Sequence, residues 1–133
     1  MKFKFLEHTA DIKFQAYGKT LQDIFENSVL ALISYMAGEK KVDSSRGKVI
    51  EVKGIDMGSL LYNFLDEIIY LVDAEDFITA KVKVTLRGNN LKAELYGDKA
   101  SKYEINQVKA ATYSEMEIKK TKDGWEAKVV LDV

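Results

Sequence analysis

The hydrophobic period of this chain changes twice from about two residues to about 3.6 and back, and few folds accommodate that pattern. Segments 2–6 and 12–17 alternate apolar and polar residues, as strands with one buried face do. Segments 20–35 and 57–72 repeat their apolar residues at helical spacing, which predicts two amphipathic helices. A short strand over 48–53 separates the helices. The first part of the chain therefore predicts the element order ββαβα.

Both predicted helices carry recognisable end signals. Thr20, followed by Asp23, is typical of an N-cap with an acidic first turn, and Gly38 ends the first helix. Asp56 caps the second helix, which runs into the acidic segment 73–76. We interpret that segment as a solvated face, with contact to a basic partner as the alternative. The expected core stripes are Leu21, Ile24, Phe25, Ser28, Val29, Leu32 and Met36 in the first helix and Leu60, Leu61, Phe64, Leu65, Ile68, Ile69 and Val72 in the second.

The rest of the chain predicts two β-hairpins. Alternating residues over 82–95 flank a Gly88-Asn89-Asn90 turn, and those over 111–131 flank an Asp123-Gly124 turn. The polar segment 97–107 has no assignment. Antiparallel hairpins with two helices packed on them give an α+β fold, with the order ββαβα followed by two hairpins. Because the chain has 133 residues and no linker or repeat, residues 1–133 are expected to form a single domain.

What the composition lacks narrows the functions available. The chain has no cysteine and one histidine, His8, which excludes thiolate nucleophiles, thiolate zinc sites and zinc sites built on several imidazoles. It has no phosphate-binding glycine motif. Its net charge of −1 gives no bulk case for binding nucleic acid or anionic lipid. No segment is apolar enough to span a membrane, and we expect a cytoplasmic protein.

The alternation leaves two aspartates at strand ends, facing away from the core. In the second strand the apolar residues occupy even positions from 12 to 16, so Asp11 points away from them. In the last strand they occupy odd positions from 125 to 131, so Asp132 does the same, and Val133 follows with a terminal carboxylate. Carboxylate oxygens are the ligands that Ca²⁺ and Mg²⁺ prefer. The pattern is compatible with a divalent-metal site, although aspartates at strand ends are more often turn formers or solvated charges.

Four segments resemble those of one known family. Residues 7–12 read EHTADI, residues 108–113 read VKAATY, residues 125–133 read WEAKVVLDV and residues 60–73 read LLYNFLDEIIYLVD. In matching order they resemble the EHTADI, VKAxTY and WxAxVVxDV motifs and the second helix of the archease family. The resemblance covers the whole chain and implies an archease-like fold. One departure is Ser114, where many family members have a histidine.

The resemblance implies an accessory protein and not an enzyme. Archeases are understood to assist the GTP-dependent tRNA-splicing RNA ligase by promoting guanylylation of the ligase and its multiple turnover. The family's metal site, carried over, falls on Asp11, Asp132 and Val133, with Ca²⁺ as the expected ion and Mg²⁺ or Mn²⁺ as alternatives. GTP and tRNA would be reached only through the ligase. His8 is expected to hydrogen-bond at the strand end, and Lys109 either meets a phosphate or a partner's acidic group or makes no specific contact.

Two other functions stay open. A chaperone or modulator of tRNA-modifying enzymes such as methyltransferases is a role also associated with archeases. It would rely on an exposed apolar patch or on a homo-oligomer instead of a metal. A metal-assisted hydrolase would use Asp11 and Asp132 as a catalytic pair. The sequence shows no nucleophile or substrate pocket for a hydrolase, so this function ranks last.

Overall fold

The computed structural model describes residues 1–7, 11–38 and 40–133. It contains two helices and seven strands within those residues, and every element that the sequence predicts is present. The elements are β1 Phe3–Leu6, β2 Ile12–Gly18, α1 Leu21–Met36, β3 Arg46–Lys53, α2 Met57–Glu75, β4 Phe77–Arg87, β5 Asn90–Lys99, the 3₁₀ turn η1 Ala100–Lys102, β6 Ala110–Thr121 and β7 Gly124–Asp132.

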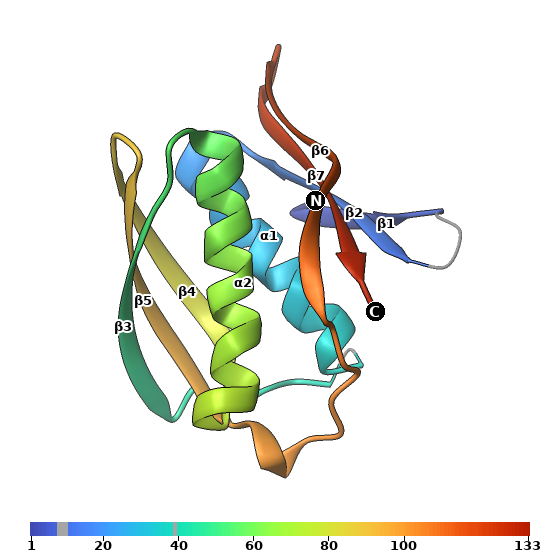
Figure 1. Ribbon diagram of the computed structural model, residues 1–133, viewed down its shortest axis with the longest axis vertical. Coiled ribbons are helices and arrows are strands. Elements are labelled where there is room, and N and C mark those ends of the chain that lie inside the picture. The colour runs from blue at the N-terminus through green and yellow to red at the C-terminus, as the bar shows by residue number, and fades with distance from the viewer. Residues whose placement is uncertain (8–10, 39) are drawn as a thin grey trace.

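The strands form two antiparallel sheets, and the two helices lie between them (Figure 1). The larger sheet has the order β1-β2-β7-β6, and the smaller sheet has the order β3-β5-β4. Helix α1 contacts β2 of the larger sheet and β4 of the smaller one, and α2 contacts β6 and β4. The predicted α+β class, with two helices packed on antiparallel sheets, is confirmed.

The side chains at the helix starts form the hydrogen bonds that their sequence predicts. The hydroxyl of Thr20 accepts from the backbone N–H of Asp23 at 3.1 Å, and the Asp23 carboxylate accepts from the N–H of Thr20 at 3.2 Å. At α2 the carboxylate of Asp56 accepts from the N–H of Ser59 at 2.8 Å, and the Ser59 hydroxyl accepts in return from the N–H of Asp56 at 3.2 Å. Both are reciprocal capping boxes, which satisfy backbone groups that a helix leaves unpaired.

Helix α2 ends at Asp76, whose backbone has a left-handed φ of 51°. Its carboxylate accepts from the backbone N–H of Ser101 at 2.7 Å and from the Ser101 hydroxyl at 3.0 Å. The solvated-face interpretation is therefore wrong for Asp76, because this carboxylate ties the helix end to the turn after β5. The solvated-face interpretation does agree with the exposure of the residues from Asp73 to Glu75.

The core fills the space between the two sheets. Both predicted helical stripes point into it, and Val72 and Leu21 lie partly buried at its margin. The largest fully buried side chains include Phe14 of β2 together with Phe25 and Phe64, whose rings stack with centroids 6.3 Å apart. Strand β1 contributes less to this core than β2 does. The largest fully buried residues are Phe14, Phe25, Phe64, Ile24, Leu32, Met36, Leu60, Leu61, Leu65, Ile68, Leu71 and Ile78.

The polar segment 97–107, which has no assignment from the sequence, contains the end of β5, the η1 turn and a stretch of coil. Asp98 anchors it and is 2 % exposed. One oxygen of its carboxylate accepts from the Tyr103 hydroxyl at 2.8 Å, and the other accepts from the Lys99 N–H at 2.8 Å. The Tyr103 hydroxyl in turn accepts from the N–H of Asp43 at 3.0 Å. The segment is ordered by this network and not by regular secondary structure.

Across the residues described, neither helix combines the length and the apolar character that crossing a membrane requires.

Candidate metal centre at the paired strand ends

The register of β2 and β7 brings Asp11 and Asp132 to the same end of the larger sheet. The ladder begins with Ile12 opposite Leu131, so one further step in the same register sets Asp11 opposite Asp132. Figure 1 shows the end of β7 near the start of β2. Both aspartates are half-buried. Two acidic residues that are far apart in the sequence thus come to the same end of the β2–β7 pair, one residue beyond its last paired position.

The third strand at this end of the sheet is β6, and it places Lys109 next to Asp132. Ala110 pairs with Asp132 in the β6–β7 ladder, and the N–H of Lys109 donates to the Asp132 carbonyl oxygen at 2.8 Å. The Lys109 side chain is exposed. The second motif of the sequence therefore meets the last motif directly. His8, from the first motif, lies outside the residues that the structure describes.

An ion pair crosses the outer face of the sheet close to the two aspartates. The ammonium of Lys13 lies 2.8 Å from the Glu115 carboxylate. Lys13 and Thr112 both pair with Val130 of β7, so the ion pair joins β2 and β6 across that strand. Glu115 has a φ of 60° and belongs to an irregular stretch of β6. Sequence alternation did not reveal this contact, because the irregular stretch breaks the period on which the parity argument depends.

The donor atoms of the two aspartates fit a hard divalent cation, because all of them are carboxylate oxygens. Within the described part of the chain, no three Asp, Glu, His or Cys side chains gather closely enough to hold a metal ion. Asp11 and Asp132 alone would therefore supply only part of a coordination shell. The remaining ligands of an ion here would be Val133, water or groups from a partner. Ca²⁺ takes about six to eight oxygens, so two aspartates leave most of its positions open.

A polar groove adjoins Lys109 between α2 and β3, and the sequence patterns did not predict it. Asp66 on this side of α2 accepts from the N–H of Ala111 at 3.3 Å, which covers part of the β6 edge. The negative charge of Asp66, together with burial, raises the pKa of Tyr62. The Tyr62 ring stacks on Tyr113 with centroids 4.4 Å apart. In the sequence, this face could have been found from the polar residues of α2 that lie opposite its stripe of buried apolar residues. The groove is lined by Glu51, Val52, Lys53, Asn63, Asp66, Glu67, Ile69, Tyr70, Asp73, Lys109 and Ala110.

Comparison with known proteins gives concordant matches over the full length. The model of the "Archease protein family (MTH1598/TM1083)" matches residues 3–133. Protein archease of Methanosarcina barkeri is 37% identical over 140 residues, which cover 99% of this chain and 96% of that protein.

Two solved structures share the fold. The solution structure of Methanobacterium thermoautotrophicum protein 1598 is 32% identical, covers 99% of each chain and superposes with a TM-score of 0.82. The crystal structure of a Thermotoga maritima archease, described as a possible chaperone, is 21% identical, with a TM-score of 0.71 over 98% of this chain and 96% of that one. The second likeness shows the fold alone.

Proposed function

This chain belongs to the archease family, and from that premise we propose that it is a metal-binding cofactor of the GTP-dependent tRNA-splicing RNA ligase in the cytoplasm. The observation that supports the proposal is the pairing of Ile12 with Leu131, since one further step in that register would set Asp11 opposite Asp132. In this proposal both aspartates and Val133 hold a divalent ion, with Ca²⁺ first and Mg²⁺ or Mn²⁺ as alternatives. The protein promotes guanylylation and turnover of the ligase and catalyses no reaction itself.

The strand positions of the aspartates suit this role. When bound, a divalent ion neutralises triphosphate charge and orients the leaving pyrophosphate in nucleotidyl transfer. Asp132 is the last residue of β7, and the hydrogen bond from Lys109 to its carbonyl oxygen fixes its backbone. Ligands held by sheet ladders are positioned more narrowly than ligands on loops. In this proposal the ladder preorganises Asp132, and Asp11 is held near it because it directly precedes the first paired residue of β2.

Lys109 is the residue that we assign to the partner side of the site. Its side chain is exposed, and its backbone is joined to that of Asp132. An ammonium beside the carboxylates can meet a nucleotide phosphate or an acidic group of the ligase. Lys13 is less suited to that contact, because its ammonium is already paired with Glu115.

A single-turnover guanylylation assay of the ligase tests the proposal. Adding this protein with a divalent ion should accelerate formation of the guanylylated ligase, and Asp132→Asn should remove the acceleration while the circular dichroism spectrum stays unchanged. Asp123→Asn, in the exposed turn between β6 and β7, is the matched control and should activate normally. Normal activation by the folded Asp132→Asn variant would refute the metal-dependent role.

The second candidate is a chaperone or modulator of tRNA-modifying enzymes such as methyltransferases. It is suggested by the description of the Thermotoga maritima archease as a possible chaperone. Affinity capture from native extract separates the two functions, because the first retains the ligase and the second retains a methyltransferase. Hydrolysis of a phosphoester by the protein alone, lost in Asp11→Asn, would instead establish the hydrolase.

A further inference from the structure

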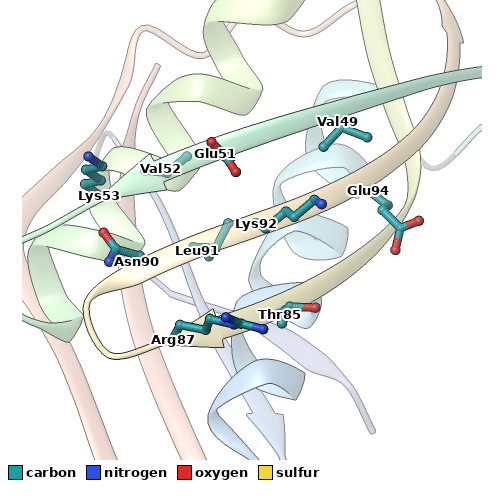
Figure 2. A pocket seen from close by; sticks show the side chains of 10 residues that line it. All are labelled: Val49, Glu51, Val52, Lys53, Thr85, Arg87, Asn90, Leu91, Lys92 and Glu94. Atoms are coloured by element: carbon teal, nitrogen blue, oxygen red, sulfur yellow. The ribbon is translucent and has the colours of Figure 1, made fainter.

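The outer face of the smaller sheet carries excess positive charge, although the whole chain has a net charge of −1. The outward-facing side chains of its paired strands include five cations and two acidic residues, Glu51 and Glu94. The face therefore has an excess of three positive charges. Figure 2 shows several of these side chains side by side along β3, β5 and β4. The cations are exposed and are Lys53, Lys81, Lys83, Arg87 and Lys92.

We call these five cations the basic face; Lys92 and Lys83 stand opposite Glu51 and Glu94 in the strand register. In the part of the chain that the structure describes, none of them forms an ion pair. Lysines elsewhere do so, including Lys48 with Glu75 and Lys119 with Glu126. The positive charge of the basic face is therefore available to an anionic ligand from outside the chain.

Tyr96 adds an aromatic surface to the basic face. It lies on the central strand β5, between Gly47 of β3 and Lys81 of β4, and it is 43% exposed. A Cβ atom placed on Gly47 would lie 3.7 Å from Cε1 and 3.8 Å from Cδ1 of the Tyr96 ring. The ring thus lies beside the glycine at about van der Waals distance from such a Cβ, and its exposed part faces solvent. An exposed ring beside a row of cations, as Tyr96 lies beside Lys81, is an arrangement on which single-stranded nucleic acids bind.

We propose that the basic face binds single-stranded nucleic acid, with a base stacked on Tyr96 and phosphates on the surrounding cations. From Tyr96 to Asn90 strand β5 spans roughly 20 Å, enough for several nucleotides. An acidic polypeptide would use the cations but would gain little from stacking on the ring. A duplex would keep its bases inside. The single strand is the ligand that uses both features.

This inference goes beyond the proposed function and uses a different surface. The basic face belongs to the smaller sheet, whereas Asp11 and Asp132 lie at the end of the larger one. It also departs from the expectation that nucleic acid is reached only through a partner. That expectation was drawn from the net charge, in which 20 basic and 21 acidic residues cancel. The cancellation does not hold locally on this sheet.

Fluorescence anisotropy with a short labelled oligouridylate tests the proposal. Wild-type protein should bind it, with an affinity that falls as salt rises. The double variant Lys83→Glu with Lys92→Glu should reduce the slope of log affinity against log salt by about 1.4, since each single-strand phosphate contact contributes about 0.7. The charge-matched control, Lys2→Glu with Lys122→Glu, alters exposed lysines of the larger sheet and its hairpin turn and should bind like wild type.

Tyr96→Leu separates stacking from charge. It retains every cation and should weaken binding on the order of tenfold, the usual effect of removing one aromatic platform. A duplex of the same length should bind more weakly than the single strand. The proposal is overturned if the oligonucleotide does not bind, or if the control weakens binding as much as the double variant. It is also overturned, in favour of an acidic protein partner, if polyglutamate binds as tightly and Tyr96→Leu has no effect.

Discussion

The carboxylate of Glu26 on α1 accepts a hydrogen bond from the backbone N–H of Val84, 2.8 Å away, at the edge of the smaller sheet. One helical turn earlier, Gln22 accepts from the N–H of Leu86 at 3.1 Å. Strand β4 pairs only with β5 in this sheet, so these two N–H groups point toward the unpaired side. Unpaired edge groups are a template for association with another chain. Here, side chains of α1 accept hydrogen bonds from these edge groups and so cover them.

Removing the Glu26 acceptor should lower stability and promote self-association. Glu26→Ala leaves the N–H of the buried Val84 without its partner, at a cost of roughly 1–3 kcal/mol in the free energy of unfolding. Glu26→Gln keeps an acceptor and should restore most of that loss. Urea unfolding and size-exclusion chromatography measure the two effects. Glu67→Ala, a half-buried helical glutamate of α2, is the control, and an equal loss there would contradict the edge role.

A bound divalent ion should stabilise the fold through Asp11 and Asp132. A ligand that binds only the folded state adds about 2.7 kcal/mol at a hundredfold excess over its dissociation constant. For a chain of this size that raises the unfolding temperature on the order of 10 °C. Differential scanning calorimetry with and without Ca²⁺ measures the shift. Asp132→Asn should abolish it, and an undiminished shift in that variant would place the ion elsewhere.

The ionised carboxylate of Asp98 should stabilise the protein at neutral pH. The Tyr103 hydroxyl, then the Lys99 N–H and the Lys102 ammonium, hold the pKa of Asp98 below its ordinary value. A lowered pKa means that the folded state binds fewer protons. The stabilisation is therefore fully present above the unfolded pKa of about 3.9 and is lost as the pH falls through the lower folded value.

Asp98→Asn should accordingly lower the unfolding temperature at pH 7 and flatten its decline below about pH 4. Thermal unfolding followed by circular dichroism across this range gives both quantities. Asp73→Asn, at an exposed position on α2, should leave the pH profile parallel to that of wild type. If Asp98→Asn is also parallel to wild type throughout, the proposed linkage is absent.

Gly97 occupies a position where any side chain collides with the neighbouring strand. An added Cβ would lie 1.9 Å from the carbonyl oxygen of Ile78 and 2.9 Å from its carbonyl carbon, and backbone atoms cannot turn aside. Gly97→Ala should therefore reduce the free energy of unfolding by about 3 kcal/mol. Gly58→Ala, in the first turn of α2 with 3.6 Å to the nearest atom, should instead increase it by about 0.5 kcal/mol. Urea denaturation of both variants checks the opposite signs.

The sequence predicted the elements well where local chemistry determines them. Thr20 and Asp56 set the helix starts through bonds to residues three positions on, and these bonds are present. The alternation also predicted which strand faces are buried, but one face does not specify a neighbour. The partition of the strands into two sheets and the insertion of β7 between β2 and β6 depend on packing between distant segments. They could not be derived from local patterns.

The candidate site likewise has a part that the sequence predicts and a part that depends on packing between distant segments. Parity selected Asp11 and Asp132 separately, and only the β2–β7 register brings the ends of the strands that they flank together. The ion pair of Lys13 with Glu115 was missed, because it depends on a local break in the β6 ladder.

Strand β1 shows the limit of alternation as a predictor of burial. Phe3 and Phe5 do share a face, with ring centroids 5.8 Å apart, yet Phe5 is 42% exposed because β1 is the edge of its sheet.

The pairing of β2 with β7 also governs when the larger sheet can form. Ile12 and Leu131 lie near opposite ends of the sequence, so the β1–β2 hairpin leaves the ribosome long before the strand that completes it. Contacts of such long range slow folding, and the unmatched hairpin stays open to wrong partners in the interval. A nascent chain that stops short of β7 has Asp11 but not the opposing carboxylate. Only a chain that has reached β7 carries both acidic residues.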